Sequence, residues 1–563
     1  MKQQRILPVQ LFRVVTLAVA ALVLAVTTST TSQAQFSVLH DFLGSDSADG
    51  CNPTYSGIVA QGRDGNMYGT TENGGAPAFT NNVGTVFQVT PAGVLAVIYS
   101  FPSSETAGWL PFSGLTLGTD GNFYGTTYYY GLPEGSYFGS VFQITPGGIL
   151  TYLYIFTGGT DGRHPTAPPI QGTDGNWYGT TQGDFSNPGT VYKLTLPNTL
   201  KTLYQFVLGE QPEDPLVQAT DGNFYGTTHY GGTSNNGSVF RITPAGKFTV
   251  IYNFDTTNGQ APYSPLIQGT DGNFYGTTIS GGSAGGGVVF KLTSAGKITV
   301  LYNFIQGDTP SVPIAGLVQA TDGFFYGATD AGNSHGGTTS DGTVFRISGK
   351  PSTPSYLHDF DQSPTASKPQ DTLLQHTNGI LYGDTFEGGD PASGCGVFYS
   401  WNAGLKPFVS LVFTSAKVGK TIQILGQKFT GTTGVSFNGV AAAFTVVSDT
   451  YLTAVVPTGA RTGSVTVTTP GGPLTSNKKF RVTPQILSFS PPSGPVGTAV
   501  TITGVSLTQT TKVTFGGVTA TTFTVISDTQ VTATVPTGGK TGKIGITTPG
   551  GTATSSGTFT VTP

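Results

Sequence analysis

The chain has 563 residues, of which 10% are charged and 82 are glycine, and its formal net charge is −4. Charged residues usually make up roughly 25% of a soluble domain, and the length exceeds that of one compact domain. An acidic chain with scattered Lys and Arg has no electrostatic footprint for nucleic acid, so we expect no such partner. Short runs of Val, Thr, Tyr and Phe between clusters of turn residues exclude a mainly helical chain and predict an all-β fold.

The first 34 residues predict a signal peptide. Three basic residues precede an apolar run from Val14 to Val26, and Ser32-Gln33-Ala34 offers small residues at the cleavage site. Cleavage after Ala34 changes the balance from 25 basic and 29 acidic residues to 22 and 29, a net charge of −7. The alternative is an uncleaved anchor, although a spanning helix needs roughly 20 apolar residues. We expect a secreted or cell-surface protein, not inserted in the membrane after cleavage.

Residues 35–404 carry one unit seven times. Successive turns lie 47 to 56 residues apart, which is typical of propeller blades. The turn is Asp-Gly at Asp64, Asp120, Asp174, Asp221, Asp271 and Asp322, and Asn378-Gly379 in the seventh copy.

Each unit predicts four antiparallel strands, the number in one blade. The strands are LIQ, NFYGTT, GSVFRIT and KFTVIYNF, and the first pair turns through Asp-Gly, the second through Pro-Ala-Gly. We expect the Tyr of YGTT and the Phe of VF to be buried. The glycine of YGTT, as at Gly125, is predicted to leave room for a side chain of a neighbouring blade.

The order of the strands predicts how the ring closes. Seven apolar fourth strands end in Phe, but the first of them, FSVLHDF, precedes any complete unit, and none follows the third strand Val397–Tyr399. The predicted fold is therefore a seven-bladed β-propeller closed by its N-terminal strand, which leaves no open sheet edge.

Cys51 and Cys395 are the only cysteines, and alternating strand direction places both at the same end of the closing seam. In an exported protein this predicts a disulfide. Two free, buried thiols are the alternative.

The repeated string GTDGNFYGTT, followed by Gly-Gly and GxVFKLTPAGK, resembles the tandem repeat called GloVer over all seven units. That repeat occurs in exported bacterial proteins with varied anchoring ends. The resemblance supports the architecture and implies no defined activity.

Two further modules follow, predicted over residues 405–484 and 485–563. Their matching motifs lie 78 or 79 residues apart, and short, regularly spaced strands predict β-sandwiches. The string PQILSFSPPSGPVGTAVTITG resembles the IPT/TIG immunoglobulin-like domain, which implies a spacer or a binding unit. The first copy departs from it at residues 413–416.

No catalytic or metal-binding motif is evident, and we expect no metal and no cofactor. The six His fall in different units without a ligand spacing. The repeated Asp is interpreted as a turn residue that caps its own backbone. The alternative, a calcium ligand, has one carboxylate per turn against the six to eight oxygens that Ca²⁺ takes. Propeller lyases with a repeated Asp-Gly-Asn are a further alternative, but their His and Glu pair is not found.

The long loops share the end opposite the tight turns, and they are rich in aromatic rings that suit stacking on sugars or gripping a peptide. The alternative is that these rings only cover the blade ends. The candidate ligand face comprises Trp109, Tyr128, Tyr129, Tyr130, Tyr137, His229 and Tyr230, with Phe112, Phe138, Tyr263 and His335 on the same loops.

These observations predict a noncatalytic, monomeric binding protein, with the propeller as the recognition head for a glycan or a surface protein and the sandwiches as its stalk. The alternative is a secreted hydrolase or lyase that acts on polysaccharide. It would require two loop acids to converge within about 5 to 10 Å. The candidates are Glu72, Glu105, Glu134, Asp161, Asp184, Glu210 and Asp330.

Overall fold

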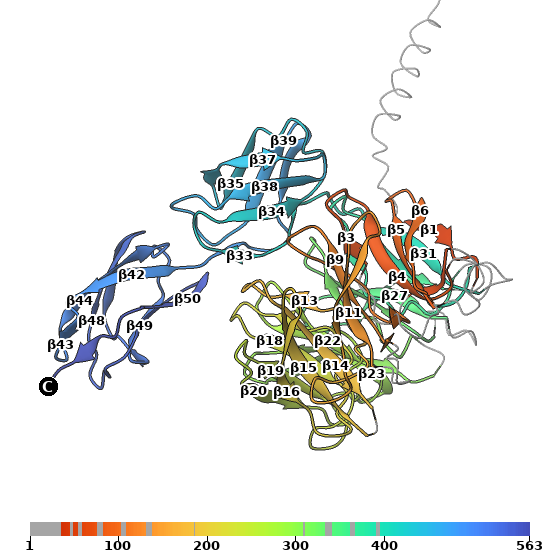
Figure 1. The fold of residues 1–563 in the computed structure, drawn as a ribbon, viewed down its shortest axis with the longest axis horizontal. Coiled ribbons are helices and arrows are strands. Elements are labelled where there is room, and N and C mark those ends of the chain that lie inside the picture. The colour runs from red at the N-terminus through yellow and green to blue at the C-terminus, as the bar shows by residue number, and fades with distance from the viewer. Residues whose placement is uncertain are drawn as a thin grey trace, which may run out of the picture.

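The computed structural model describes residues 35–44, 49–53, 59–75, 83–102, 108–130, 138–184, 186–307, 310–332, 341–360, 366–389 and 394–563 (Figure 1). This part of the chain is all-β, as predicted. Among these residues no helix has the length and apolar character needed to cross a membrane. The predicted signal peptide lies outside the described residues.

Seven antiparallel sheets of four or five strands occupy residues 35–402, and they have the form of propeller blades. The first contains β2 (Cys51–Pro53), β3 (Ala60–Gln61), β4 (Met67–Asn73), β5 (Thr85–Val89) and β6 (Leu95–Ser100). The second contains β8 (Thr116–Leu117), β9 (Phe123–Thr127), β11 (Ser140–Ile144) and β12 (Leu150–Ile155). The third contains β13 (Ile170–Gln171), β14 (Trp177–Gly183), β15 (Pro188–Thr195) and β16 (Thr199–Gln205).

The remaining sheets repeat this order. The fourth contains β17 (Val217–Gln218), β18 (Phe224–Thr228), β19 (Ser238–Ile242) and β20 (Phe248–Asn253). The fifth contains β21 (Ile267–Gln268), β22 (Phe274–Thr278), β23 (Gly285–Leu292) and β24 (Ile298–Ile305). The sixth contains β25 (Val318–Gln319), β26 (Phe325–Thr329), β27 (Thr343–Ile347) and β28 (Ser355–Asp359). The seventh contains β29 (Leu374–Gln375), β30 (Leu381–Asp384), β31 (Val397–Asn402) and β1 (Gln35–Asp41), and a separate pair joins β7 (Gly108–Trp109) to β10 (Tyr129–Tyr130).

The Asp-Gly turn forms for the reason that the sequence predicts. Asp271 accepts hydrogen bonds from the backbone N of Asn273 (3.1 Å), the side-chain Nδ2 of Asn273 (2.8 Å) and the hydroxyl of Tyr275 (2.8 Å). Gly272 has a φ of +82°, which glycine adopts without steric cost. The repeated Asp therefore caps its own turn and holds the Tyr of the next strand.

Apolar clusters join each sheet to the next. In one of them, Tyr68 of the first sheet stacks on Phe123 of the second, with ring centroids 4.0 Å apart. The cluster that contains Phe42, Phe87 and Phe398 joins the seventh sheet to the first. As predicted, the repeated Tyr of YGTT and the Phe of VF belong to this core, and all are at most 2% exposed.

The interpretation of the YGTT glycine is wrong in one respect. A Cβ on Gly125 would lie 2.6 Å from the ring of Phe142, which is its cross-strand partner in the same sheet, and 2.9 Å from Leu115, which directly precedes the first strand of that sheet. The glycine therefore makes room for side chains of its own blade, not of a neighbouring one.

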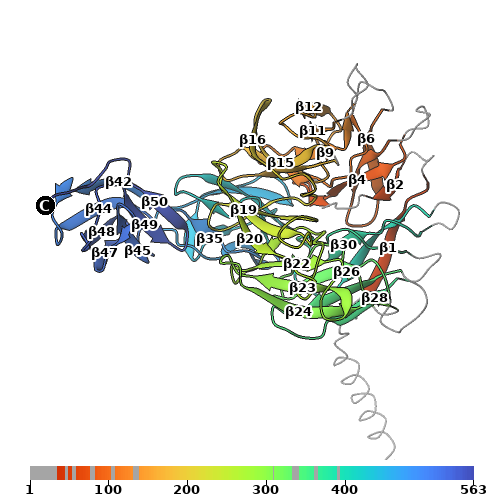
Figure 2. The same ribbon diagram turned by 90° about the horizontal axis from the view of Figure 1, so that it is seen from below.

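The N-terminal strand completes the last sheet, as predicted. β1 pairs antiparallel with β31, so that Phe36 lies opposite Trp401, and Figure 2 shows β1 in red beside the later strands of the chain. Cys51 and Cys395 form a disulfide across a sequence separation of 344 residues, which confirms the predicted bond. Next to it, the backbone N of Asn52 donates to the carbonyl of Cys395 (3.0 Å).

Two β-sandwiches follow, each with one apolar core between two sheets. The first pairs the sheet of β32 (Ser410–Leu411), β34 (Thr421–Leu425), β38 (Tyr451–Val455) and β37 (Phe444–Val446) with that of β36 (Val440–Ala442), β35 (Gly434–Phe437), β39 (Val465–Thr469) and β40 (Gly472–Thr475). The second pairs β42 (Gln485–Ser490), β44 (Ala499–Val505), β48 (Gln530–Thr534) and β47 (Phe523–Ser527) with β46 (Val518–Thr519), β45 (Lys512–Phe515), β49 (Ile544–Thr548) and β50 (Gly551–Thr554).

A short parallel pair closes each sandwich. It joins β33 (Ser415–Ala416) to β41 (Arg481–Val482) in the first and β43 (Ser493–Gly494) to β51 (Thr560–Val561) in the second. The first domain therefore has the same N-terminal strand pairing as the second, although its sequence at residues 413–416 differs from the IPT/TIG pattern.

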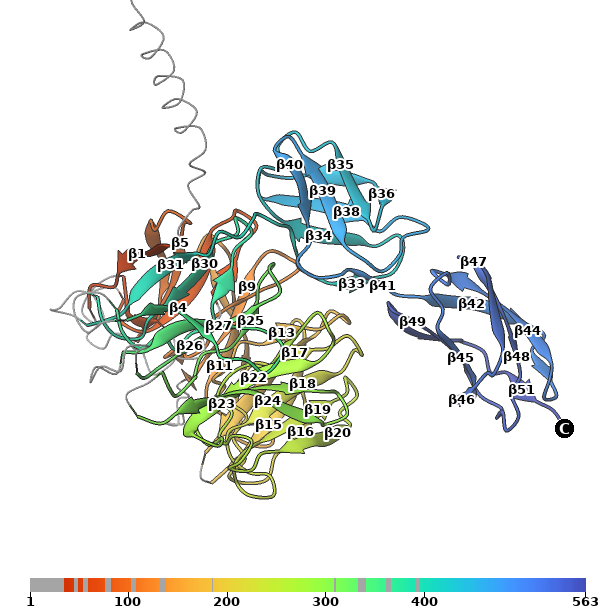
Figure 3. The same cartoon turned by 180° about the vertical axis from the view of Figure 1, so that it is seen from behind.

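The first sandwich rests on the Asp-Gly end of the blades, next to the closing seam, and the second is held further away (Figure 3). Arg63 stands where the next five turns have Thr. Its guanidinium donates to the side chain of Gln423 (2.9 Å) and lies over the ring of Tyr451, 4.7 Å from the centroid. The Thr450 hydroxyl donates to the Arg63 carbonyl (2.7 Å). Thr377 of the seventh turn accepts from Gln427 (2.9 Å).

We expect Arg63→Thr, which restores the residue of the next five turns, to loosen this contact without damaging the turn. The lost charge-assisted hydrogen bond and ring contact are worth about 1 to 3 kcal/mol together. Thermolysin cleavage between Gly404 and Leu405, in the connector to the sandwich, should therefore become about tenfold faster. Thr173→Ala, at the corresponding turn of the third sheet, is the control. An unchanged cleavage rate in Arg63→Thr would contradict the docking role of Arg63.

Candidate binding pocket

A cavity of about 500 Å³ lies at the end of the blades opposite the Asp-Gly turns. Its walls come from two repeated positions. The first is the residue after YGTT or its equivalent, and the second is the residue after the Pro that precedes each first strand. The first position supplies Glu72, Tyr128, Gln182 and Phe386. The second position supplies Phe112, Thr166, Glu213 and Tyr263. The residues Leu110, Tyr129 and Asp214, which are adjacent to these positions, complete the lining.

Backbone hydrogen bonds tie the two positions together in each unit. The N of Tyr128 donates to the carbonyl of Leu110 (2.9 Å), and the N of Gln182 donates to the carbonyl of His164 (3.0 Å). Both acceptor residues directly precede the Pro, and both have a φ of 55°. The side chains of the cavity therefore project from a repeated backbone frame, while their identity changes from unit to unit.

Aromatic rings form one wall. Tyr128 stacks on His164 (centroids 4.5 Å apart, interplanar angle 10°) and meets Phe112 edge-on (4.9 Å). Tyr129 lies edge-on to Tyr128 (4.7 Å), and its strand pairs with that of Trp109. Packing on several sides fixes these rings, so a flat ligand would meet a preformed surface.

The structure brings together only part of the predicted ligand face. Tyr128 and Tyr129 line the cavity, as do Phe112 and Tyr263, which were placed on the same loops. Trp109 lies behind Tyr129, with centroids 5.7 Å apart. Three of the other rings pack on protein side chains: Tyr130 on Tyr152, His229 on Tyr263, and Phe138 under the guanidinium of Arg163. Tyr230 is 44% exposed and lies outside the cavity. Tyr137 and His335 lie outside the described residues.

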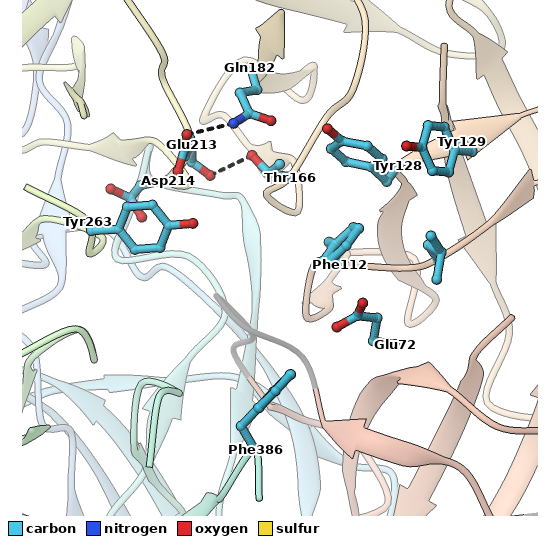
Figure 4. A pocket seen from close by; sticks show the side chains of 11 residues that line it. Glu72, Phe112, Tyr128, Tyr129, Thr166, Gln182, Glu213, Asp214, Tyr263 and Phe386 are labelled. Atoms are coloured by element: carbon cyan, nitrogen blue, oxygen red, sulfur yellow. Dashed lines mark hydrogen bonds between the residues drawn. The ribbon is translucent and has the colours of Figure 1, made fainter. Parts of the chain in front are cut away.

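Two adjacent carboxyl groups form the opposite side of the cavity. Glu213 is 8% exposed and accepts a hydrogen bond from the Gln182 amide (2.6 Å). Asp214 is 4% exposed and accepts one from the Thr227 hydroxyl (2.9 Å). Figure 4 shows Glu72 across the cavity from both.

Burial raises the pKa of Glu213 to about 7, against the opposing effect of hydrogen bonds from Gln182 and Tyr263. It also raises the pKa of Asp214 to about 7, helped by the negative charge of Glu213 and opposed by the bond from Thr227. The pKa of Glu72 is likewise raised by burial. Glu213 and Asp214 are therefore partly protonated near neutral pH, and a protonated carboxyl group offers both a donor and an acceptor.

Burial lowers the pKa of His229 to about 4, so its imidazole is neutral at physiological pH. Within the described residues no group of three or more His, Cys, Asp or Glu is arranged to hold a metal ion.

Glu213 and Asp214 were not among the site residues predicted from the sequence. They stand where the third unit has Thr166-Ala167 and the fifth has Tyr263-Ser264, so an alignment of the seven units would have exposed the acidic pair. Of the predicted loop acids, Glu72 alone lines the cavity. The cavity lining does not include Asp161, Asp184, Glu210 or Asp330, and Glu105 and Glu134 lie outside the described residues.

Comparison with protein families gives two matches. The model of the Gloeobacter/Verrucomicrobia repeat matches residues 24–214, 134–336 and 207–399, and the IPT/TIG domain matches residues 407–482 and 484–561. No curated protein matches the chain.

Several solved structures are distantly similar. A surface glycan-binding protein from Prevotella bryantii is 22% identical, with 26% of this chain and 38% of that one covered and a TM-score of 0.21. A gluconolactonase from Xanthomonas campestris is 13% identical (51% and 84% covered, TM-score 0.31). A protein of unknown function from Bacteroides thetaiotaomicron is 14% identical (65% and 75% covered, TM-score 0.35). The chain thus spans well under half the length of the glycan-binding protein, and at these TM-scores the likenesses say nothing about function.

Proposed function

Because the chain belongs to the Gloeobacter/Verrucomicrobia repeat family and continues into two IPT/TIG domains, we propose that it is an exported, noncatalytic binding protein for a carbohydrate. Its head is a seven-bladed propeller over residues 35–404, closed by the N-terminal strand. Its stalk consists of the IPT/TIG domains, over residues 405–484 and 485–563. A disulfide that closes the ring supports export to an oxidising compartment.

The single observation that carries the proposal is the composition of the cavity. Fixed rings of Tyr128, Phe112 and Tyr263 stand beside the amide of Gln182 and the carboxyl of Glu213. Sugars present apolar faces edged with hydroxyl groups, so a binding site for them combines stacking rings with hydrogen-bonding groups that both donate and accept. A volume of about 500 Å³ also lies in the usual range of ligand sites.

The placement of the stalk supports the same function. The first IPT/TIG domain contacts the turns at Arg63 and Thr377, and the cavity lies at the other end of the blades. A chain held through its stalk would therefore present the cavity outward.

A second candidate function, cleavage of a polysaccharide, is favoured by Glu213 and Asp214. A carboxyl group with a pKa near 7 suits general acid catalysis. The two groups lie on one loop, whereas glycoside cleavage uses carboxyl groups that flank the bond, so Glu72 across the cavity would have to be the second group.

We expect Tyr128→Ala to weaken carbohydrate binding by about tenfold or more, because a buried stacking ring contributes at least 1 to 2 kcal/mol. The full-length protein would be screened on an array of glycans, and affinities for the hits measured by titration calorimetry. Tyr230→Ala, which removes an exposed ring outside the cavity, is the control and should leave affinity unchanged.

Two outcomes would count against this proposal. If no glycan binds, or if both Tyr variants bind as the parent does, the cavity is not a carbohydrate site. If a bound polysaccharide is shortened by the parent and not by Glu213→Gln, the enzyme replaces the binding protein as the function.

A further inference from the structure

Charge is distributed unevenly in the cavity. Three carboxyl groups line it, those of Glu72, Glu213 and Asp214, and no Lys or Arg is among the lining residues. A ligand with carboxylate or sulfate groups would therefore meet only like charge and neutral groups.

Several other carboxylates of the chain are paired with cations. Asp184 binds Arg163 (2.5 Å), Glu387 binds Lys368 (2.7 Å) and Asp271 binds Lys291 (2.7 Å), and each of these acids is more exposed than Glu213 or Asp214. The two more deeply buried acids have only neutral donors instead, Gln182 for Glu213 and Thr227 for Asp214. These two buried carboxyl groups at the cavity thus have no basic side chain among the partners described for them.

Asp214 has hydrogen-bonding capacity to spare. It is more than nine-tenths buried and accepts the bond from Thr227 through Oδ2, one of its two carboxyl oxygens. A carboxyl group can accept several hydrogen bonds, so a donor on a ligand in the cavity would add to the bond from Thr227.

Aromatic rings surround the same space. Phe112, Tyr128, Tyr263 and Phe386 all line it, and the face of an aromatic ring attracts a cation. Rings combined with carboxyl groups and no basic residue form an environment that favours a positively charged group over a neutral one.

We propose that the cavity selects a glycan with free amino groups, whose ammonium lies between the aromatic wall and the carboxyl groups of Glu213 and Asp214. This inference rests on the proposed function, that the cavity binds a carbohydrate. The ammonium supplies the countercharge that the fold omits, and its N–H groups supply donors to the carboxyl oxygens. N-acetylation of the sugar removes both the charge and two of the donors.

The test compares oligosaccharides of equal length with the full-length protein by titration calorimetry: β-1,4-linked glucosamine, its N-acetylated form, the corresponding glucose oligomer and a polyuronate. We expect the glucosamine oligomer to bind about tenfold or more tightly than the acetylated and glucose forms, since hydrogen bonds to charged groups contribute about 1.5 to 3 kcal/mol. The polyuronate should not bind.

Glu213→Gln keeps the shape of the side chain and removes its charge. It should abolish most of the preference for the amino sugar, because it lowers the affinity for the glucosamine oligomer far more than the affinity for the glucose oligomer. Glu210→Gln makes the same change of charge on the same loop, but outside the cavity, and therefore controls for general attraction of a polycation to an acidic protein.

The outcomes separate the two proposals. If no oligosaccharide binds, the proposed function itself fails. If the glucose or acetylated oligomers bind as tightly as the amino sugar, or if Glu213→Gln and Glu210→Gln lower the preference equally, the cavity binds a carbohydrate without selecting the amine. Tighter binding of a lysine-rich peptide than of the glucosamine oligomer, lost in Glu213→Gln, would overturn the assignment to a glycan.

Discussion

Replacing Cys51 and Cys395 with serine lowers the free energy of unfolding of the repeat region by about 5 kcal/mol, the largest effect that we expect from any simple change. The bond joins residues 344 positions apart, and a cross-link restricts the unfolded chain more strongly as the loop that it closes becomes longer. The folded ring loses little, because β1 still pairs with β31 through its backbone.

Chemical denaturation of the parent and the double variant measures this effect. The parent in reducing conditions should match the variant, and each single serine variant should match the double one, because either replacement removes the bond. Equal denaturation midpoints for the parent and the variant would contradict this expectation, because the disulfide would then add nothing to the stability that strand pairing and the apolar clusters provide.

The second large effect concerns Asp214, whose replacement by Asn should stabilise the protein at alkaline pH. Burial raises the pKa of Asp214 in the folded state to about 7, from its ordinary value of 3.8. The folded state therefore holds this proton more tightly than the unfolded state does. The resulting stability is fully present below about pH 4 and is lost as the pH rises through about 7. Asn does not ionise, so it avoids a loss of about 4 kcal/mol at most.

Urea denaturation at pH 4, 6 and 8 tests this expectation. The advantage of Asp214→Asn over the parent should be near zero at pH 4 and largest at pH 8, and the same variant should bind its ligand more weakly. Asp255→Asn, at an exposed position, is the control. An advantage that does not change with pH would show that the carboxyl group is not held in a desolvated state. Residues that lower the stability of the folded protein are common at sites that serve a function.

Much of the fold could be predicted from the sequence because the same pattern of strands and turns recurs in all seven units. Asp-Gly turns, short apolar strands and the missing fourth strand after Tyr399 together placed β1 beside β31. The disulfide followed, since Cys51 and Cys395 flank that seam. The environment of Gly125 was predicted wrongly because a glycine indicates close approach without indicating which strand approaches.

The cavity was harder to predict, for a physical reason. Its residues come from different units and are brought together only when the blades close into a propeller, so Glu72 and Glu213 share one cavity only in the folded molecule. The informative positions are also those where a unit departs from the consensus. Tyr128 and Tyr129 were recognised because aromatic residues stand out in a loop, whereas an acidic pair between two prolines resembles an ordinary turn.

Docking of the first IPT/TIG domain could not be foreseen either, because Arg63 and Gln423 lie 360 residues apart. The departure of Arg63 from the Thr of the next five turns was nevertheless visible in the sequence.

The bond between Cys51 and Cys395 also affects how the molecule responds to cleavage of its backbone by a protease. Most of the head lies between these two residues, so a single cut in any loop there leaves both fragments covalently joined. The fragments also remain held by the interlocked sheets on either side of the cut. A molecule with one cut in its backbone would therefore keep the cavity assembled, unless the cut fell among the residues that line the cavity.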